Sequence, residues 1–250
     1  MEAARSLPWE GCTNIRDLGG RPLEAGGVTA FGVVLRGDNV RNLNKAGWRA
    51  LVDYGVRRLV DLRWPEELDE DPGLDGPVEV AHVSLLGPHR PESRYVRFAA
   101  LAAEVEDEAA FVRRLYGEYL EEFPDRFAAA VDAVACAPGP VLVHCTAGKD
   151  RTGIVAALVL RLVGVGIDAI AVDYALTDVQ GLLRRGLADG MSDDEVRARR
   201  FLLSAPHAGM AQFLHDVEDR YGSAHAYLMR AGLDPAAARE LKRRLAPGLA

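Results

Sequence analysis

Short apolar runs rich in β-branched residues recur along the chain and are separated by longer stretches in which apolar and polar positions are mixed. Runs at 28–35, 56–62 and 78–86 have the length and composition of strands. A further short run, Val141 to Val143, follows the turn Pro138-Gly139-Pro140 and also predicts a strand. The pattern therefore predicts strands that are interleaved with helices.

The longer stretches predict the helices. Asn44 is a good N-cap for the first of them, and Asp234 for the last, while Gly55 ends the first. The predicted helices run from about 44 to 54, from 95 to 123 with a break near 104–108, from 124 to 135, from 154 to 160, and as a pair from 227 to 245.

One strand-to-helix junction carries a concentration of chemistry, the segment HCTAGKDRTG from His144 to Gly153. Cys145 stands where the strand ends, and Gly148 relaxes the steric limit on φ in the turn that follows. A loop wound this tightly at a helix N-terminus directs successive N–H groups inward and forms a nest for an anion. The segment therefore predicts a phosphate cradle.

The side chains of this segment suggest a nucleophilic site. Arg151 supplies a planar fork that can hold two phosphate oxygens through the transition state. The donors that bind the substrate also favour the thiolate form of Cys145. The Thr152 hydroxyl can donate to that thiolate and help it to leave. A buried structural cysteine is the ordinary alternative, but the co-placed residues His144, Cys145, Gly148, Arg151, Thr152 and Gly153 favour function.

The pattern His-Cys-x5-Arg-Thr-Gly resembles the signature loop of the cysteine-dependent protein tyrosine phosphatases. The version Ala147-Gly148-Lys149-Asp150-Arg151 resembles their bacterial branch, which includes mycobacterial and listerial virulence phosphatases. The resemblance implies an α/β fold with a central, mostly parallel sheet flanked by helices, in one domain over residues 1–250. It also implies a helical lid insertion at about 87–123 and a helical C-terminal region at about 168–250.

Other segments carry the same resemblance. Asn14-x-Arg16-Asp17-Leu-Gly-Gly is similar to an N-terminal motif that packs beside the signature loop, so Arg16 and Asp17 are expected to support it, although they could simply pair with each other. Gly37 stands where the family usually has Ser. Asp173-Tyr-Ala-Leu-Thr resembles the element that begins the C-terminal helical region.

Asp61-Leu62-Arg63 resembles the Asp-Leu-Arg motif of the family. Alternation places Asp61 and Arg63 on the same side of a strand end. Ligands of open α/β sheets bind beyond the carboxyl ends of the strands, so this motif and Cys145 could share one crevice. A structural ion pair between Asp61 and Arg63 is as good an interpretation as a catalytic role.

Trp64-Pro65-Glu66 resembles the Trp-Pro-Asp loop that carries the general acid in many tyrosine phosphatases. Here the third residue is Glu, and the tripeptide lies 81 residues before Cys145, farther away than that loop usually is. We therefore do not assign it as the acid.

The outer part of the signature loop is expected to set proton delivery and substrate choice. Asp150 could protonate the leaving oxygen or cap the following helix, and Asp61 is the second candidate for the acid. Lys149 resembles the loop lysine of phosphoinositide-active phosphatases, where a cation attracts a second phosphate. The expected phosphate-binding residues are Thr146, Ala147, Gly148, Lys149, Asp150 and Arg151, and His144 and Thr152 are expected to support them.

Composition narrows the function classes. The 250-residue chain carries a net charge of −7, which disfavours nucleic acid and anionic membranes as partners. Three cysteines are too few and too unevenly spaced for a disulfide framework or a zinc site, and a reducing compartment fits them best. We expect a cytoplasmic protein without an integral membrane segment, although members of the family can be exported without an obvious signal. The sequence does not specify the oligomeric state.

The sequence therefore predicts a phosphomonoester hydrolase with a phosphocysteine intermediate and no metal or other cofactor. Its expected substrates are phosphotyrosine proteins, with phosphoserine, phosphothreonine or phosphoinositides as further substrates. Two alternatives are a non-catalytic phosphate-binding module and a thiol-dependent arsenate reductase. The reductase would need Cys12 or Cys136 as a resolving thiol near Cys145.

Overall fold

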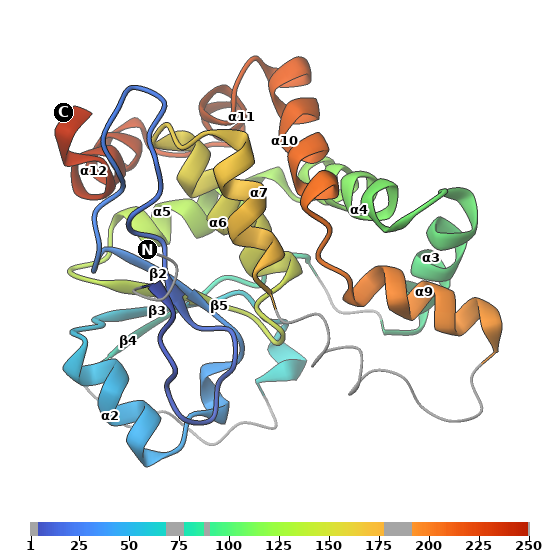
Figure 1. Ribbon diagram of the computed structural model, residues 1–250, viewed down its shortest axis with the longest axis horizontal. Helices are drawn as coiled ribbons and strands as arrows, with labels where there is room; N and C mark the ends of the chain where they lie inside the picture. Colours follow the sequence, from blue (N-terminus) through green and yellow to red (C-terminus); the bar gives the residue numbers. More distant parts are fainter. Residues whose placement is uncertain (1–4, 69–77, 88–90, 178–191, 250) are drawn as a thin grey trace.

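A five-stranded sheet forms the centre of the molecule in the computed structural model, with helices on both faces (Figure 1). The structure describes residues 5–68, 78–87, 91–177 and 192–249. The strand order is β1-β2-β5-β3-β4, and β1 is antiparallel to β2 whereas the other neighbours are parallel. The strands are β1 (Arg16–Asp17), β2 (Val34–Gly37), β3 (Arg58–Asp61), β4 (Glu79–His82) and β5 (Val141–His144). The predicted α/β class and its mostly parallel sheet are confirmed.

The register of the sheet brings three strand ends together. His144 at the end of β5 lies beside Gly37 of β2 on one side and beside Asp61 of β3 on the other. The loops that follow these strands therefore leave the sheet side by side, at the carboxyl ends of the strands. Cys145 comes directly after His144, between the loops that follow β2 and β3.

The two faces of the sheet have separate cores. Leu35, Leu59 and Leu142 face α2 (Lys45–Asp53) and pack with Leu51 of that helix. The valines that alternate with these leucines face the other side, where α5, α6 and α7 cover the sheet (Figure 1). Strand alternation thus produces two apolar layers, and the larger one joins the sheet to the C-terminal helices.

Most predicted helices are confirmed, including the N-caps Asn44 and Asp234 and the break after residue 104. The final pair begins at Ala224, slightly before the predicted start. The remaining helices are α3 (Pro91–Glu104), α4 (Glu108–Glu122), α5 (Pro124–Ala135), α6 (Asp150–Leu162), α7 (Ile167–Ala175), α9 (Asp193–Leu203), α10 (His207–Tyr221), α11 (Ala224–Arg230) and α12 (Pro235–Leu245), with single 3₁₀ turns η1 (Val40–Asn42), η2 (Pro65–Glu67) and η3 (Pro247–Leu249). None of the helices in the described ranges has the length and apolar character needed to cross a bilayer.

The strand predicted at 28–35 is wrong over most of its length. Only Val34 and Leu35 of that run enter β2, because residues before them form a separate excursion closed by Gly26 and Gly27 at positive φ. Within it, Thr29 donates from its backbone N–H to the carbonyl of Arg21 rather than to the sheet. Arg16–Asp17, which lies outside every predicted strand, forms the edge strand β1.

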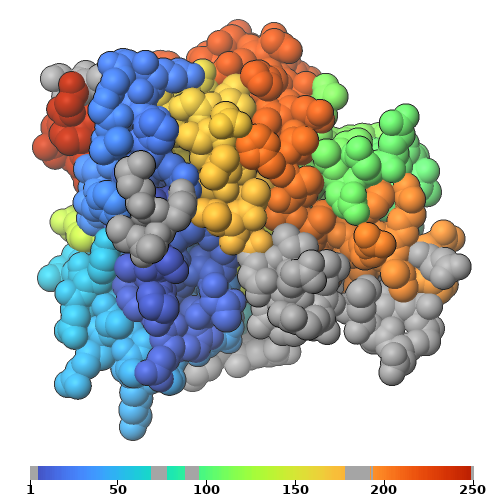
Figure 2. Space-filling model, in the orientation of Figure 1, coloured from blue at the N-terminus to red at the C-terminus, as the bar shows by residue number. Residues whose placement is uncertain are grey.

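A helical lobe projects from one side of the molecule. Figure 2 shows it in green and orange, and it consists of α3 and α4 together with α9 and the start of α10. α9 packs on α3 and α4, and α4 packs along α10. The expected lid at about 87–123 corresponds to α3 and α4, and its covering role stays a prediction. Residues 88–90 of that insertion, and 178–191 and 250 of the C-terminal region, lie outside the described residues.

Candidate active site

The loop after β5 turns into α6 within a few residues, as the sequence predicts. Gly148 has φ +67° in this turn, a region that residues with a Cβ rarely adopt. A Cβ added there would lie 2.5 Å from the carbonyl oxygen of Gly37. The loop thus packs directly on the backbone at the end of β2, and only glycine fits at position 148.

Side chains from the N-terminal segment hold the carbonyl groups of this loop from outside. The amide Nδ2 of Asn14 donates to the carbonyls of Ala147 and Gly148, at 3.1 and 3.3 Å. Arg36 Nη2 donates to the Gly148 carbonyl as well, at 2.8 Å. Among the described residues, the backbone N–H groups of residues 146–149 have no hydrogen-bond partner. With the carbonyls tied outward, these donors are left for an anion.

A buried cluster of charges supports those side chains. Asp173 on α7 accepts hydrogen bonds from Arg5, Arg16, Arg21 and Arg36, and all five residues are at most 5% exposed. Although burial alone would raise the pKa of Asp173, the charges of Arg16 and Arg36 hold it far below its usual value. The ionised carboxylate fixes Arg36, which in turn holds the Gly148 carbonyl.

Arg16 and Asp17 have different partners and do not form the ion pair considered from the sequence. Arg16 contacts Asp173 and the side chain of Asn14, so it supports the signature loop indirectly. Asp17 accepts hydrogen bonds from the backbone N–H groups of Gly19 and Gly32 and from the Tyr54 hydroxyl. Asp17 therefore stabilises the chain around β1 and does not contact the loop itself.

Glu67 holds the guanidinium of Arg151. Its carboxylate accepts from Arg151 Nη1 at 2.6 Å and from Nη2 at 3.0 Å, and the Thr146 hydroxyl donates to it as well. The guanidinium carbon lies 4.3 Å from the centroid of the Trp64 ring. Burial raises the pKa of Glu67, but Arg151 outweighs this effect and lowers it to about 2. Arg151 is thus held by an ionised partner on one side and an aromatic ring on the other.

The clamp leaves one edge of Arg151 for a ligand. Among the described residues, no contact uses Nε, and Nη2 has its second contact with the Thr146 hydroxyl at 3.0 Å. A phosphate that displaced this hydroxyl would meet Nε and Nη2 as a fork. Burial lowers the pKa of Arg151. Its hydrogen bonds with Glu67 and its electrostatic interaction with Cys145 outweigh burial and raise this pKa.

Asp61 and Arg63 form the structural ion pair. Arg63 donates to both carboxylate oxygens of Asp61, with its Nη2 at 2.8 Å, and both residues are 1% exposed. His144 Nε2 is 3.7 Å from Asp61, but burial lowers the pKa of His144 to about 4. The ring is therefore neutral near neutral pH, and the contact is not a salt bridge there. This geometry favours a supporting role for all three residues.

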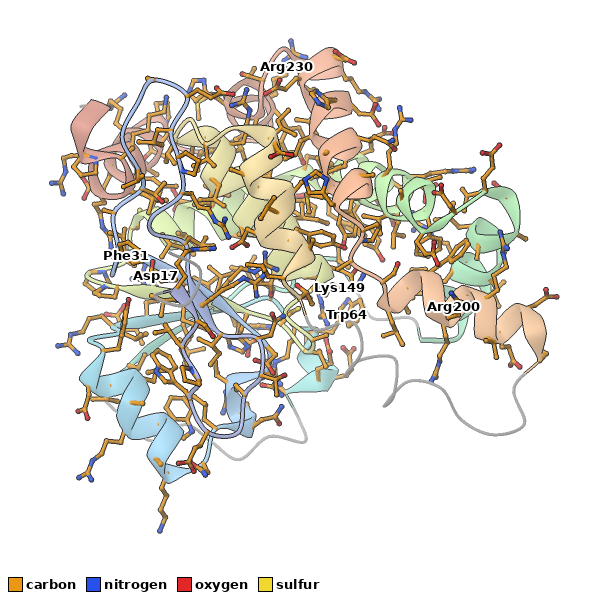
Figure 3. The ribbon with its side chains drawn as sticks, in the orientation of Figure 1. Asp17, Phe31, Trp64, Lys149, Arg200 and Arg230 are labelled. Atoms are coloured by element: carbon orange, nitrogen blue, oxygen red, sulfur yellow. The ribbon has the colours of Figure 1, made fainter. Side chains whose placement is uncertain are left out.

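Lys149 does not reach the outer surface of the loop, contrary to the expectation that it offers a cation to a second phosphate. The residue is 1% exposed, and its Nζ donates to the Ser204 carbonyl at 3.0 Å and to Asp150 Oδ1 at 2.6 Å. Its charge also interacts electrostatically with Tyr174. Figure 3 shows Lys149 and Trp64 at the carboxyl ends of the strands, where the sheet meets the helices. The long stem of Lys149 carries its charge inward.

Cys145 is 3% exposed at the base of the loop. Among the described residues, the buried Thr152 hydroxyl has no hydrogen-bond partner, and its donation to a Cys145 thiolate stays a prediction. Asp150 begins α6 and keeps 26% of its side-chain surface exposed. The strand ends thus bring together a buried thiol, a loop whose backbone N–H groups have no partner among the described residues, a guanidinium held by Glu67 and a partly exposed carboxyl group.

Comparison with known proteins shows which family the chain belongs to. Residues 7–247 match the tyrosine phosphatase family. The chain belongs to that family. It is 27% identical to the triple specificity protein phosphatase PtpB of Mycobacterium tuberculosis, over 96% of this chain and 98% of that protein. It is 28% identical to a tyrosine-protein phosphatase of Nostoc commune, over 84% of this chain and 73% of that protein.

This tyrosine phosphatase is therefore an enzyme that acts on phosphorylated substrates. Within its described residues, no group of three or more His, Cys, Asp or Glu side chains is arranged to hold a metal ion. The guanidinium of Arg151 brings a positive charge to the loop, and the backbone N–H groups of the loop add partial positive charge.

Several site residues of the phosphatase were missed from sequence. Glu67 directly follows the Trp64-Pro65-Glu66 motif, which we considered only as a source of the acid. Glu67 accepts a hydrogen bond from the backbone N–H of Trp64, but a Trp at this position is not a capping-box signal that a sequence would show. Asn14 and Asp173 lie in motifs that resemble the family. The contact of Asn14 with the loop and that of Asp173 with Arg36 could be seen only in the folded structure. For Tyr116 and Tyr174, the sequence pattern indicates only that they occupy buried helix positions.

Proposed function

We propose that this phosphatase hydrolyses phosphomonoesters through a phosphocysteine intermediate on Cys145. The observation that carries the proposal is the loop of residues 146–149, whose carbonyls are tied outward above a buried thiol. A phosphate in this nest would have its phosphorus in line with the Cys145 thiolate. The inward N–H groups are pre-organised for the charge that develops on the equatorial oxygens.

In the first step, the thiolate forms the S–P bond while the bond from phosphorus to the leaving oxygen breaks. Arg151 binds two equatorial oxygens through Nε and Nη2, and Glu67 with Trp64 keeps the guanidinium in place. In the second step, water attacks the phosphocysteine and the S–P bond breaks. The Thr152 hydroxyl stabilises the departing thiolate.

Asp150 is our choice for the general acid. It is partly exposed at the mouth of the nest, whereas Asp61 is 1% exposed and bound at both oxygens by Arg63. Burial raises the pKa of Asp61, but its hydrogen bonds and ion pair with Arg63 outweigh burial and lower it, so this carboxyl group is held in its ionised form. A well-placed acid typically contributes about 10²–10⁴-fold to the rate.

We propose phosphotyrosine as the preferred substrate, in line with the family. The name of the mycobacterial relative states triple specificity for that protein, and activity of this chain on phosphoserine, phosphothreonine or phosphoinositides remains a proposal. The buried Lys149 argues against recognition of a second phosphate by its ammonium group. We also propose a cytoplasmic location for this enzyme.

Purified protein tested on phosphotyrosine, phosphoserine and phosphothreonine peptides and on phosphoinositides would establish the substrate class. We expect the highest kcat/KM on phosphotyrosine peptides and no turnover by Cys145→Ser. Turnover by Cys145→Ser at the rate of the unmodified enzyme would contradict the proposal. A non-catalytic phosphate-binding module would bind phosphotyrosine without turnover in either form.

The arsenate reductase alternative lacks a suitable second thiol. Cys136 lies at the end of α5, before the start of β5, and thus at the opposite end of that strand from Cys145. Cys12 donates its thiol proton to the Asn39 carbonyl, and burial together with Asp38 raises the pKa of Cys12 strongly. A protonated thiol is a poor resolving nucleophile. Arsenate-dependent thiol oxidation without phosphatase turnover would revive this alternative.

A further inference from the structure

Two buried donors converge on a single oxygen of Asp150. The hydroxyl of Tyr116, on α4, donates to Asp150 Oδ1 at 2.7 Å, and Lys149 Nζ contacts the same oxygen at 2.6 Å. Tyr116 is fully buried and Lys149 is 1% exposed. Because 26% of the Asp150 side chain is exposed while Oδ1 faces buried donors, the exposed oxygen is Oδ2.

The hydrogen bonds around Tyr116 have a fixed direction. An Asp150 oxygen that faces both donors can only accept, so Tyr116 donates its single proton to Oδ1. The Tyr116 oxygen must then accept from Tyr174, whose hydroxyl lies 2.7 Å away. Lys149 also interacts electrostatically with Tyr174. The hydrogen bonds therefore run from Tyr174 through Tyr116 to Asp150.

The ammonium group of Lys149 is turned away from the surface. Two of its three donors are directed to the Ser204 carbonyl and to Asp150 Oδ1. Because the residue is 1% exposed, it presents no donor at the surface for a substrate. In the cluster formed by Asp150, Lys149, Tyr116, Tyr174 and Ser204, the lysine and both tyrosines are buried, whereas the Asp150 side chain keeps part of its surface exposed.

We propose that Tyr116 is a positioning residue that sets which oxygen of Asp150 carries the transferable proton. This inference rests on the proposed role of Asp150 as the general acid. With Oδ1 occupied by two donors, a proton bound to Asp150 sits on Oδ2, the oxygen that has no partner among the described residues. Tyr116 thus keeps the carboxyl group in the orientation that proton transfer needs.

Asp150 gives up one proton in the first step and regains one in the second. When the S–P bond forms and the bond to the leaving oxygen breaks, the proton on Oδ2 passes to the leaving oxygen, and Asp150 becomes a carboxylate. Tyr116 and Lys149 remain bound to Oδ1 and stabilise that carboxylate. When water attacks phosphorus and the S–P bond breaks, the water proton returns to Oδ2. Tyr116 keeps its own proton throughout.

Leaving-group dependence separates this role from a structural one. A poor leaving group such as an alkoxide requires the acid, whereas p-nitrophenolate scarcely does. We expect Tyr116→Phe to lower kcat/KM about 10-fold on an alkyl phosphate, in keeping with one lost hydrogen bond to a charged group, and to leave p-nitrophenyl phosphate within about 2-fold. Tyr174→Phe keeps the bond from Tyr116 to Asp150, so we expect a smaller change of the same kind.

Tyr227→Phe is the matched control. Tyr227 is also buried, and its hydroxyl donates to the Leu120 carbonyl at 3.0 Å, in the packing of α11 against α4. Loss of that hydroxyl should leave the ratio of the two kcat/KM values unchanged. Thermal unfolding of all the variants reports whether each retains its fold, and Tyr174→Phe tests the same hydrogen-bond chain if Tyr116→Phe does not fold.

Asp150→Asn and the double variant complete the test. We expect Asp150→Asn to show the larger leaving-group-dependent loss, and the Tyr116→Phe change to add nothing to it, because both act on one proton. If Tyr116→Phe lowered kcat/KM equally for the two esters, or if its effect added fully to that of Asp150→Asn, the role of Tyr116 would be wrong while the acid assignment of Asp150 would stand. An equal effect of Asp150→Asn on both esters would overturn the acid assignment and the inference together.

Discussion

The signature loop is supported in two different ways on its two sides. The Arg151 side consists of Arg151, Thr146, Trp64 and Glu67, where the support follows β3 directly and is an ion pair with an aromatic stack. The Asp150 side is the cluster of Asp150, Lys149, Tyr116, Tyr174 and Ser204. Its support comes from α4, α7 and the junction between α9 and α10, and two of its members are neutral hydroxyls.

This difference separates phosphate binding from proton delivery. The Arg151 side is fixed by segments that leave the sheet beside β5, so its geometry is set by the strand register. The Asp150 side is fixed by helices outside the sheet, two of which belong to the projecting lobe or adjoin it. We infer that changes in the helical region can alter the handling of the leaving group while the phosphate nest stays unchanged.

The largest expected effect is on the Arg151 side. Arg151→Lys keeps a positive charge but loses the fork for phosphate and the paired contact with Glu67. We expect kcat/KM to fall about 10²–10³-fold on every ester, as for the loss of a transition-state donor, with no dependence on the leaving group. Steady-state kinetics on aryl and alkyl phosphates would check this. A loss confined to the alkyl ester would mean that the two sides are not separate.

Glu67→Gln should have the next largest effect. The amide keeps the shape of Glu67 but lacks the charge that holds both Nη atoms of Arg151. We expect kcat/KM to fall about 10-fold or more, together with a weaker affinity for vanadate, because the guanidinium is no longer fixed. The control is Glu66→Gln, since Glu66 is the exposed neighbour in η2. Equal changes of kcat/KM and vanadate affinity in the two variants would refute the role of Glu67 in holding Arg151.

Lys149→Met should have a smaller effect that does not depend on the number of phosphates in the substrate. The variant keeps a long apolar stem in the buried position and removes the ammonium that contacts Asp150. We expect activity to fall several-fold to about 10-fold on mono- and polyphosphorylated substrates alike. A selective loss on polyphosphoinositides would show that Lys149 reads a second phosphate, contrary to its position in the structure.

The smallest expected effect is on stability and comes from His144. The unfolded state takes up a proton on this ring below pH 6.5, whereas the folded state does so only near pH 4, so folding is destabilised as the pH falls between these values. This group alone should lower the free energy of unfolding by about 2 kcal/mol between pH 7 and pH 5. Chemical denaturation of His144→Asn should show a smaller loss over the same interval.

The Arg151 side was largely predictable, because its parts lie in sequence motifs at strand ends. The apolar runs gave the strands, the Cys145 to Arg151 spacing gave the loop, and Asp61 with Arg63 gave an ion pair. Glu67 escaped because nothing local to Trp64-Pro65-Glu66 indicates that the next carboxylate turns back to Arg151. That contact depends on the parallel register of β3 and β5.

The Asp150 side was much less predictable. Tyr116 and Tyr174 are separated from Asp150 by 34 and 24 positions, and a helical pattern shows only that such aromatic residues are buried. Lys149 lies next to Asp150 in a loop that faces the substrate, so adjacency suggested the outer surface. Its flexible stem instead follows the packing of α7 and α10, which no local pattern encodes.

The most direct test of the account is to trap the intermediate. The enzyme is mixed with p-nitrophenyl phosphate, quenched in acid during turnover and digested, and the peptide that contains Cys145 is examined by mass spectrometry. We predict that this peptide carries one phosphoryl group on the sulfur, and that the corresponding peptide of Cys145→Ser carries none. Steady turnover with an unmodified Cys145 peptide at every quench time, or a phosphoryl group on another residue, would contradict the account.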